Sequence, residues 1–186
     1  MDTNTIIIVV VVALAVLAAA VFMLMKSRRT SKLRDRFGPE YERAVDESGG
    51  KRKAEAELHD REKRVEKFEI TSLRVGERER YIAEWRKVQG EFVDSPKAAV
   101  THADELLAEV MSARGYPVGD FEQRSADLSV DHPVVVQNYR AAHDIAVRHA
   151  RGESSTEDLR QAMIHYRALF DDLVSEPDAI ASAKAS

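Results

Sequence analysis

The chain has 186 residues, of which 32% are charged, 6% are aromatic and none is cysteine, a composition that suits a helical protein and excludes disulfides and Cys-ligated zinc. The net charge of −4 is unevenly distributed, because residues 1–36 carry six basic and two acidic side chains, a net charge of +4. The remaining 22 basic and 30 acidic residues give −8, which argues against nucleic acid as a partner.

The first element in the chain is an apolar run. Residues 6–25 contain no charged or polar side chain, and as a helix they would extend about 30 Å, the hydrocarbon thickness of a bilayer. Thirteen of these twenty residues are Ile, Val, Leu or Phe, which together favour membrane insertion by about 4–8 kcal/mol. We therefore expect a transmembrane helix that contacts the lipid bilayer through residues 6–25.

The residues on either side of the run predict whether it is cleaved or retained, and how it is oriented in the membrane. A cleavable signal peptide would begin with a basic region and have a shorter apolar core, and the first five residues here contain no Lys or Arg. We therefore expect a retained single-pass anchor in the inner or plasma membrane. The basic flank follows the run, so the N-terminus should face outward and the rest of the chain should be cytoplasmic, with anionic lipid headgroups as a plausible contact. The basic flank consists of Lys26, Arg28, Arg29, Lys32, Arg34 and Arg36.

After the basic flank, glycine, proline and helix-capping residues predict the boundaries of a series of helices. Gly38-Pro39 should open a short helix that closes at Gly49-Gly50, and the Lys- and Glu-rich residues 51–68 should form an exposed or coiled-coil-like helix. Further helices are expected at about 77–92, from Pro96 to Gly115, within 118–130, from Pro133 to Gly152, and from Ser155 to about residue 175.

The expected fold class is thus all-α: a single N-terminal transmembrane helix, a charged helical stalk and a helical bundle-like soluble domain. Apolar residues recur at helical spacing in the later helices, and Trp85, Tyr139 and Tyr166 on these stripes are expected in the core. The predicted divisions are an anchor with basic flank over 1–30, a charged stalk and loop over 31–76, a helical domain over 77–175 and a disordered tail over 176–186.

No motif for catalysis or cofactor binding occurs, so we expect neither an enzyme nor a cofactor or metal site. P-loop, GxGxxG, GxSxG and HExxH patterns are all absent. The most functional-looking polar stretch spans Asp127 to His132, for which we favour helix capping by Ser129 or Asp131 before Pro133 over a binding site.

Three stretches carry a resemblance to known proteins: "RFGPEYERAV", "YIAEWRKVQGEFVDSPKAAVTHADELLAEVMSARGYP" and "FEQRSADLSVDHPVVVQNYRAAHDIAVRHARGESSTEDLRQAMIHYRALFDDLV". Together they resemble an uncharacterised family of bacterial single-pass membrane proteins, over about residues 33–175. The resemblance implies a bacterial origin and an N-terminal anchor before a helical domain, and it supplies no activity and no site residues.

These features favour a membrane-anchored helical interaction or scaffold module that docks a protein partner at the cytoplasmic face of the membrane. One alternative is an extracytoplasmic domain, either secreted or inverted. Another is an enzyme or small-ligand binder built from carboxylates and His132 or His143, which would require these side chains to converge on a pocket.

Overall fold

A computed structural model describes residues 3–175, without the side chains of residues 3–11, 15, 22 and 26. Within 3–175 all regular structure is helical and no strand occurs, which confirms the predicted all-α class. The predicted disordered tail, 176–186, lies outside the described residues. The helices are α1 (Thr3–Phe37), α2 (Pro39–Glu47), α3 (Lys51–Val65), α4 (Val75–Glu91), α5 (Pro96–Ala113), α6 (Phe121–Asp131), α7 (Val136–Ala150) and α8 (Thr156–Ser175).

Helix α1 includes both the apolar run and the basic flank in 35 continuous residues. Across the described part of the chain, no helix meets both the length and the apolarity required of a membrane span. The helix stops at Gly38, whose φ of 49° lies in the left-handed region that favours glycine, and Pro39 occupies the first turn of α2. The predicted break at Gly38-Pro39 is therefore confirmed.

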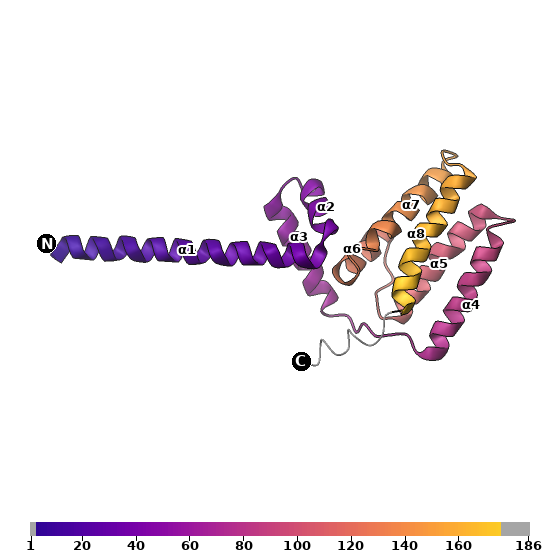
Figure 1. The fold of residues 1–186 in the computed structure, drawn as a ribbon, viewed down its shortest axis with the longest axis horizontal. Coiled ribbons are helices and arrows are strands. Elements are labelled where there is room, and N and C mark those ends of the chain that lie inside the picture. The colour runs from indigo at the N-terminus through magenta and orange to yellow at the C-terminus, as the bar shows by residue number, and fades with distance from the viewer. Residues whose placement is uncertain (1–2, 176–186) are drawn as a thin grey trace. The chain divides into compact units, whose positions relative to one another are not determined.

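The chain divides into two compact units between His59 and Asp60, within α3. In the first unit, Figure 1 shows α2 and the start of α3 beside the C-terminal part of α1. Glu55 of α3 ties the three helices together, because its carboxylate accepts hydrogen bonds from Thr30 Oγ1 of α1 (2.7 Å) and Tyr41 Oη of α2 (3.1 Å). The buried apolar residues of this unit are Leu33, Phe37, Tyr41, Ala44, Ala54 and Leu58.

This packing differs from the exposed helix expected over residues 51–68. Helix α3 ends at Val65, and its Ala54 and Leu58 are fully buried. Charged residues dominate the composition of α3, but Ala54 and Leu58 are four positions apart, so they lie on one face of the helix, and that face is buried. The predicted charged stalk thus contains a small hydrophobic core.

In the second unit, α4, α5, α7 and α8 form a bundle (Figure 1). Helix α8 packs against both α5 and α7, and α4 packs against α5. Trp85 of α4 stacks on Phe170 of α8 with ring centroids 4.7 Å apart, and Tyr139 and Tyr166 are fully buried. The three aromatic residues predicted to lie in the core do so, and each contributes a large apolar surface to it.

A latch joins the segment before α4 to the end of α5. The buried Arg114 donates from Nε to the Thr71 carbonyl oxygen (3.3 Å) and from Nη1 to the Leu173 carbonyl oxygen of α8 (3.1 Å), while Thr71 N donates to the Arg114 carbonyl oxygen (2.8 Å). Gly115 follows with φ +96°, and a Cβ there would lie 2.2 Å from the Glu69 carbonyl oxygen. The predicted stop at Gly115 is confirmed, and its glycine also permits close backbone contact.

The predicted helix start at Pro133 is wrong. Residues 133–135 form a turn, in which Val136 N donates to the His132 carbonyl oxygen (3.0 Å), and α7 begins at Val136. Val135 occupies the N-cap position of α7, so neither Ser129 nor Asp131 stands at the predicted capping position, and their side chains contact Arg61 and Tyr116. At α8 the predicted helix start at Ser155 is confirmed, and Ser155 and Asp158 form a capping box there by exchanging hydrogen bonds between side chain and backbone.

Candidate docking groove on helices α4 and α5

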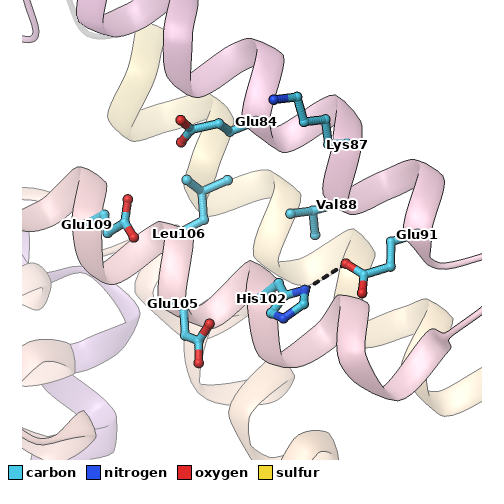
Figure 2. Close-up of a pocket in the computed structure, with 8 residues that line it drawn as sticks. All are labelled: Glu84, Lys87, Val88, Glu91, His102, Glu105, Leu106 and Glu109. Atoms are coloured by element: carbon cyan, nitrogen blue, oxygen red, sulfur yellow. Dashed lines mark hydrogen bonds and ion pairs between the residues drawn. The ribbon is translucent and has the colours of Figure 1, made fainter.

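Helices α4 and α5 line an open hollow of about 470 Å³ on the surface of the bundle (Figure 2). The two helices contribute residues three or four positions apart, which places them on one face of each helix. The hollow is lined by Glu84, Lys87, Val88 and Glu91 of α4 and by His102, Glu105, Leu106 and Glu109 of α5.

The groove combines an apolar floor with a strongly acidic rim. Val88 and the buried Leu106 supply the apolar surface. Among the described residues, Glu84, Glu105 and Glu109 form no ion pair, so their charges face solvent and project a negative potential over the hollow. Lys87 and His102 are the basic groups in the lining. The arrangement suits a ligand that carries both apolar and positively charged groups.

At one end of the groove His102 bridges the two helices. Its Nδ1 lies 2.7 Å from Glu91 Oε2, and both side chains are partly exposed (Figure 2). The hydrogen bond to the Glu91 carboxylate raises the pKa of His102 above its ordinary value, with a smaller contribution from the charge of Glu105. The pair therefore stabilises the fold fully below about pH 6.5, and this stabilisation is lost as the pH rises through the folded-state pKa of His102.

We expect the substitution Glu91→Gln to lower the pKa of His102, because it removes the charge that favours the imidazolium. NMR titration of the imidazole signals in the full chain measures this directly. Glu79→Gln, an exposed change on the same helix outside the groove, should leave the His102 titration unchanged. An unaltered His102 pKa in Glu91→Gln would show that the pair does not form in solution.

Two further hollows lie along α5, and each shares one lining residue with the first. One, of about 520 Å³, lies at the start of the helix and shares His102 with the first, and the other, of about 410 Å³, lies near its end and shares Glu109. The latter is lined in part by Tyr81 and by Val118, whose side chain is 80% exposed. Together the hollows follow the 18 residues of α5, a length of about 27 Å.

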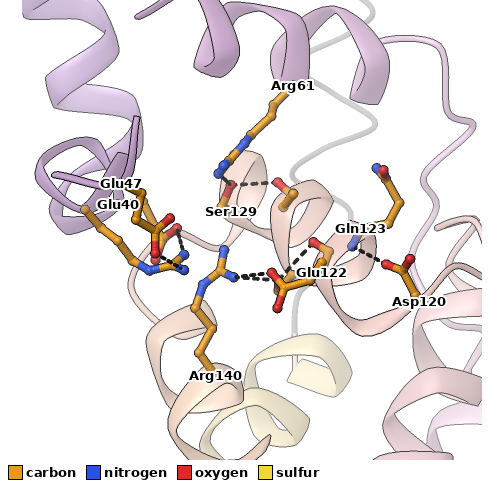
Figure 3. Close-up of polar contacts among 11 residues, drawn as sticks. Glu40, Glu47, Arg61, Asp120, Glu122, Gln123, Ser129 and Arg140 are labelled. Carbon is orange, nitrogen blue, oxygen red and sulfur yellow. Dashed lines mark hydrogen bonds and ion pairs between the residues drawn. The ribbon is translucent and has the colours of Figure 1, made fainter. Parts of the chain in front are cut away.

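The polar stretch from Asp127 to His132 makes structural contacts within the second unit. Asp127 is buried and accepts from Arg64 Nε (2.7 Å) and twice from Gln123 Nε2 (3.0 Å each). Figure 3 shows Arg61 Nη1 donating to Ser129 Oγ (3.3 Å), and Ser129 Oγ donates in turn to a carbonyl oxygen of its own helix. These contacts hold α6 against the end of α3.

A second buried polar set surrounds His132. Its Nδ1 lies 2.5 Å from Asp172 Oδ2, and its Nε2 lies 3.2 Å from Tyr116 Oη, which donates to Asp131 Oδ2 (3.1 Å). The His132 side chain is 1% exposed. Every polar atom of the ring thus has a protein partner, and the set fixes the turn between α6 and α7.

His132 and His143 contact different partners in the second unit. The ring of His143 stacks on Phe121 with centroids 3.5 Å apart, and partial burial lowers the pKa of His143. Neither histidine lines the hollows along α5. In residues 3–175, no three His, Asp or Glu side chains are grouped so as to hold a metal ion.

The basic flank lies on the last turns of α1. Arg28, Arg29, Lys32 and Arg36 have exposed side chains, and that of Lys26 lies outside the described set. Arg34 is also exposed, pairs with Glu42 (2.8 Å) and places its guanidinium 5.1 Å from the Tyr41 ring centroid. Most side chains of the basic flank are therefore exposed on the surface of α1.

Comparison with protein-family models, curated proteins and solved structures gives no match for this chain. The fold and the groove define the class as a helical bundle with an acidic, partly apolar surface groove. Sequence reasoning missed the groove because each glutamate alone resembles an ordinary exposed helix residue. The sequence pattern that could have predicted the groove is the recurrence of acidic residues on one helix face, at Glu84 and Glu91 in α4 and at Glu105 and Glu109 in α5.

Proposed function

We propose that this protein is a membrane-anchored interaction module of a bacterium, whose helical bundle docks a protein partner at the cytoplasmic face of the membrane. The observation that carries the proposal is the combination of a long apolar helix segment, an adjoining basic flank and an acidic groove on the bundle.

The apolar segment supports anchoring. Residues 6–25 carry no polar side chain, and the large apolar side chains described within this run are exposed to between 47% at Val21 and 70% at Met23. Exposed apolar surface of this extent is unfavourable in water and favourable in lipid. The resemblance to bacterial single-pass membrane proteins agrees with this assignment.

The basic flank supports the cytoplasmic orientation and contact with anionic headgroups. Six Lys or Arg residues follow the apolar run and none precedes it. Positive residues are retained on the cytoplasmic side, and each contributes about 1 kcal/mol of attraction close to an anionic surface. The alternative is an extracytoplasmic bundle. The reporter fusions described below distinguish this orientation from the cytoplasmic one.

The groove supports a binding role for the bundle. Its three unpaired carboxylates and apolar floor resemble the surfaces to which amphipathic segments bind, and the buried polar sets around Asp127 and His132 are occupied by structural contacts. The bundle therefore has a surface suited to docking, whereas the buried polar side chains around Asp127 and His132 stabilise the fold.

Membrane topology is tested with C-terminal reporter fusions to the full chain. We expect a fluorescent protein at the C-terminus to fluoresce, a periplasmic phosphatase there to stay inactive, and the protein to remain in the membrane after alkaline extraction. As a control, replacing the six basic flank residues by Gln should raise the phosphatase signal, because it removes the charges that set the orientation. An active phosphatase fusion of the unaltered chain would contradict the proposed topology, and release on extraction would contradict the anchor.

A further inference from the structure

We propose that the groove along α5 binds a basic amphipathic α-helix, about five turns long, from a partner protein. This inference rests on the proposed docking function and names the chemistry of the docked segment.

The dimensions of the groove match a helix. The linings of the three hollows include α5 residues from Pro96 to Ala113, and a helix of these 18 residues is about 27 Å long. The groove-lining positions of α4 and α5 recur every three or four residues, the same spacing at which an amphipathic helix presents its apolar side chains. Groove and ligand would therefore share one periodicity, and apolar anchors at i, i+4 and i+7 would meet Val88, Leu106 and Val118 in turn.

The charges select a basic ligand. Glu84, Glu105 and Glu109 have no ion-pair partner within the described residues, and Glu91 is paired only with the titratable His102. The linings of the three hollows also contain Lys87 and Lys97, so these four carboxylates outnumber the lysines by two. A helix with Lys or Arg beside its apolar stripe would place positive charge against these carboxylates, whereas an acidic helix would be repelled. The second unit is acidic overall, so this attraction extends beyond the groove and steers a basic partner toward the bundle.

Other recognition modes fit less well. Docking of an extended peptide by strand addition needs an exposed sheet edge, and residues 3–175 contain no strand. Recognition of a polyproline segment needs a groove lined with several aromatic rings, and Tyr81 is the aromatic residue among the linings of the three hollows.

The test measures binding of a labelled synthetic peptide to the full chain in nanodiscs of neutral phosphatidylcholine, by fluorescence anisotropy. The peptide is an 18-residue Leu/Lys helix with Leu at i, i+4 and i+7, a length chosen from the extent of α5. A peptide of the same composition with scrambled order, an equivalent Leu/Glu helix and empty nanodiscs serve as references. We expect the amphipathic basic peptide to bind the loaded discs in preference to all three, and its affinity to fall as salt is raised from about 50 to about 300 mM, roughly in line with charge screening.

Two matched variants place the peptide on the protein. Combined Glu84→Gln, Glu105→Gln and Glu109→Gln should weaken binding about tenfold or more, as expected for the loss of three partly exposed charge pairs. Combined Glu79→Gln, Glu153→Gln and Asp171→Asn makes the same change in net charge at exposed positions outside the three hollows, and should weaken binding less than about threefold. Val118→Ser should reduce binding without affecting the fold, because this side chain is 80% exposed.

Several results would overturn the inference. These are absence of binding, equal binding of the scrambled peptide or of empty discs, and equal weakening by the two triple variants. Sedimentation of the peptide-free protein as a dimer that the groove variant converts to a monomer would instead assign the groove to a second copy of this chain. All of these results leave the reporter fusions unaffected, so failure of the peptide to bind is distinguishable from failure of the proposed anchoring.

Discussion

Replacement of Gly115 by Ala is expected to lower the free energy of unfolding of the bundle by about 3 kcal/mol or more. The φ of +96° at this position is unfavourable for any residue with a Cβ, and such strain alone costs about 1–3 kcal/mol. The added methyl group would also lie 2.2 Å from the Glu69 carbonyl oxygen, a backbone atom that cannot rotate away. The segment before α4 would have to leave the end of α5, and the hydrogen bond from Thr71 N to the Arg114 carbonyl oxygen would be lost with it.

Urea unfolding of the full chain in detergent measures this effect, with Trp85 fluorescence as the signal. Trp85 is the single tryptophan and is stacked in the bundle core, so it reports on the unit that contains Gly115. Gly152→Ala is the matched control, because Gly152 also has a positive φ (+78°) but a Cβ added there would meet nothing within 4 Å. Its cost should be about 1–2 kcal/mol. Equal costs for the two variants would mean that the close approach to Glu69 does not persist in solution.

Replacement of Arg114 by Met should destabilise the bundle by about 2–5 kcal/mol. Met preserves much of the apolar volume of the arginine stem but donates no hydrogen bond, so the Thr71 and Leu173 carbonyl oxygens lose a buried donor. The buried Leu173 carbonyl oxygen left unsatisfied costs about 1–3 kcal/mol, and the partly buried Thr71 carbonyl oxygen adds a smaller cost. Because the two carbonyls belong to different segments, the variant should loosen both the region before α4 and the end of α8.

The same unfolding measurement, combined with amide hydrogen exchange around Thr71 and Leu173, tests this expectation. Arg167→Met is the matched control, because Arg167 is exposed on α8 and pairs with an equally exposed Asp171. Its loss should change the stability by less than about 1 kcal/mol. Arg114→Lys should recover only part of the stability, since an ammonium does not reproduce the planar fork that reaches two carbonyls. A stability loss for Arg114→Met no larger than that of Arg167→Met would refute the latch.

Helical periodicity and capping chemistry are sufficient to predict most of the fold. The spacing of Leu159, Met163, Tyr166, Phe170 and Leu173 predicts one buried stripe on the last helix, and all five are buried in α8. Such predictions succeed because burial of one helix face depends on local spacing, which the sequence displays directly.

Predictions fail where a distant segment determines the local structure. Pro133 carries a strong helix-start signal, but the preceding His132 is fixed by Asp172 of α8 and by Tyr116, and its carbonyl oxygen accepts from Val136 N in a turn. Neither partner is near His132 in the sequence. Arg114 likewise resembles an exposed basic residue in the sequence, and only the meeting of three segments accounts for its burial.

The groove cannot be predicted for the same reason. Its composition is visible in the sequence as two short acidic stripes, but a groove exists only once α4 and α5 lie side by side. In the sequence, Asp104 and Glu105 together indicate a solvated helix face, whereas Glu105 lines the hollow and Asp104 instead lies 3.5 Å from Arg124 on the other side of α5. Whether a carboxylate lines the groove or contacts an arginine therefore depends on which neighbouring helix it faces.

The continuity of α1 has a geometric consequence for the proposed anchor. No break separates the apolar run from Leu33 and Phe37, which are buried in the first unit. Each helical residue adds about 1.5 Å and about 100° of rotation, so Met25 and Leu33 are related by about 12 Å and a fixed angular phase. One residue inserted between them would turn the buried face by about 100° relative to the apolar run, whereas seven would restore the phase to within about 20°. The spacing within α1 thus sets both the rotation of this buried face about the helix axis and its distance from the apolar run.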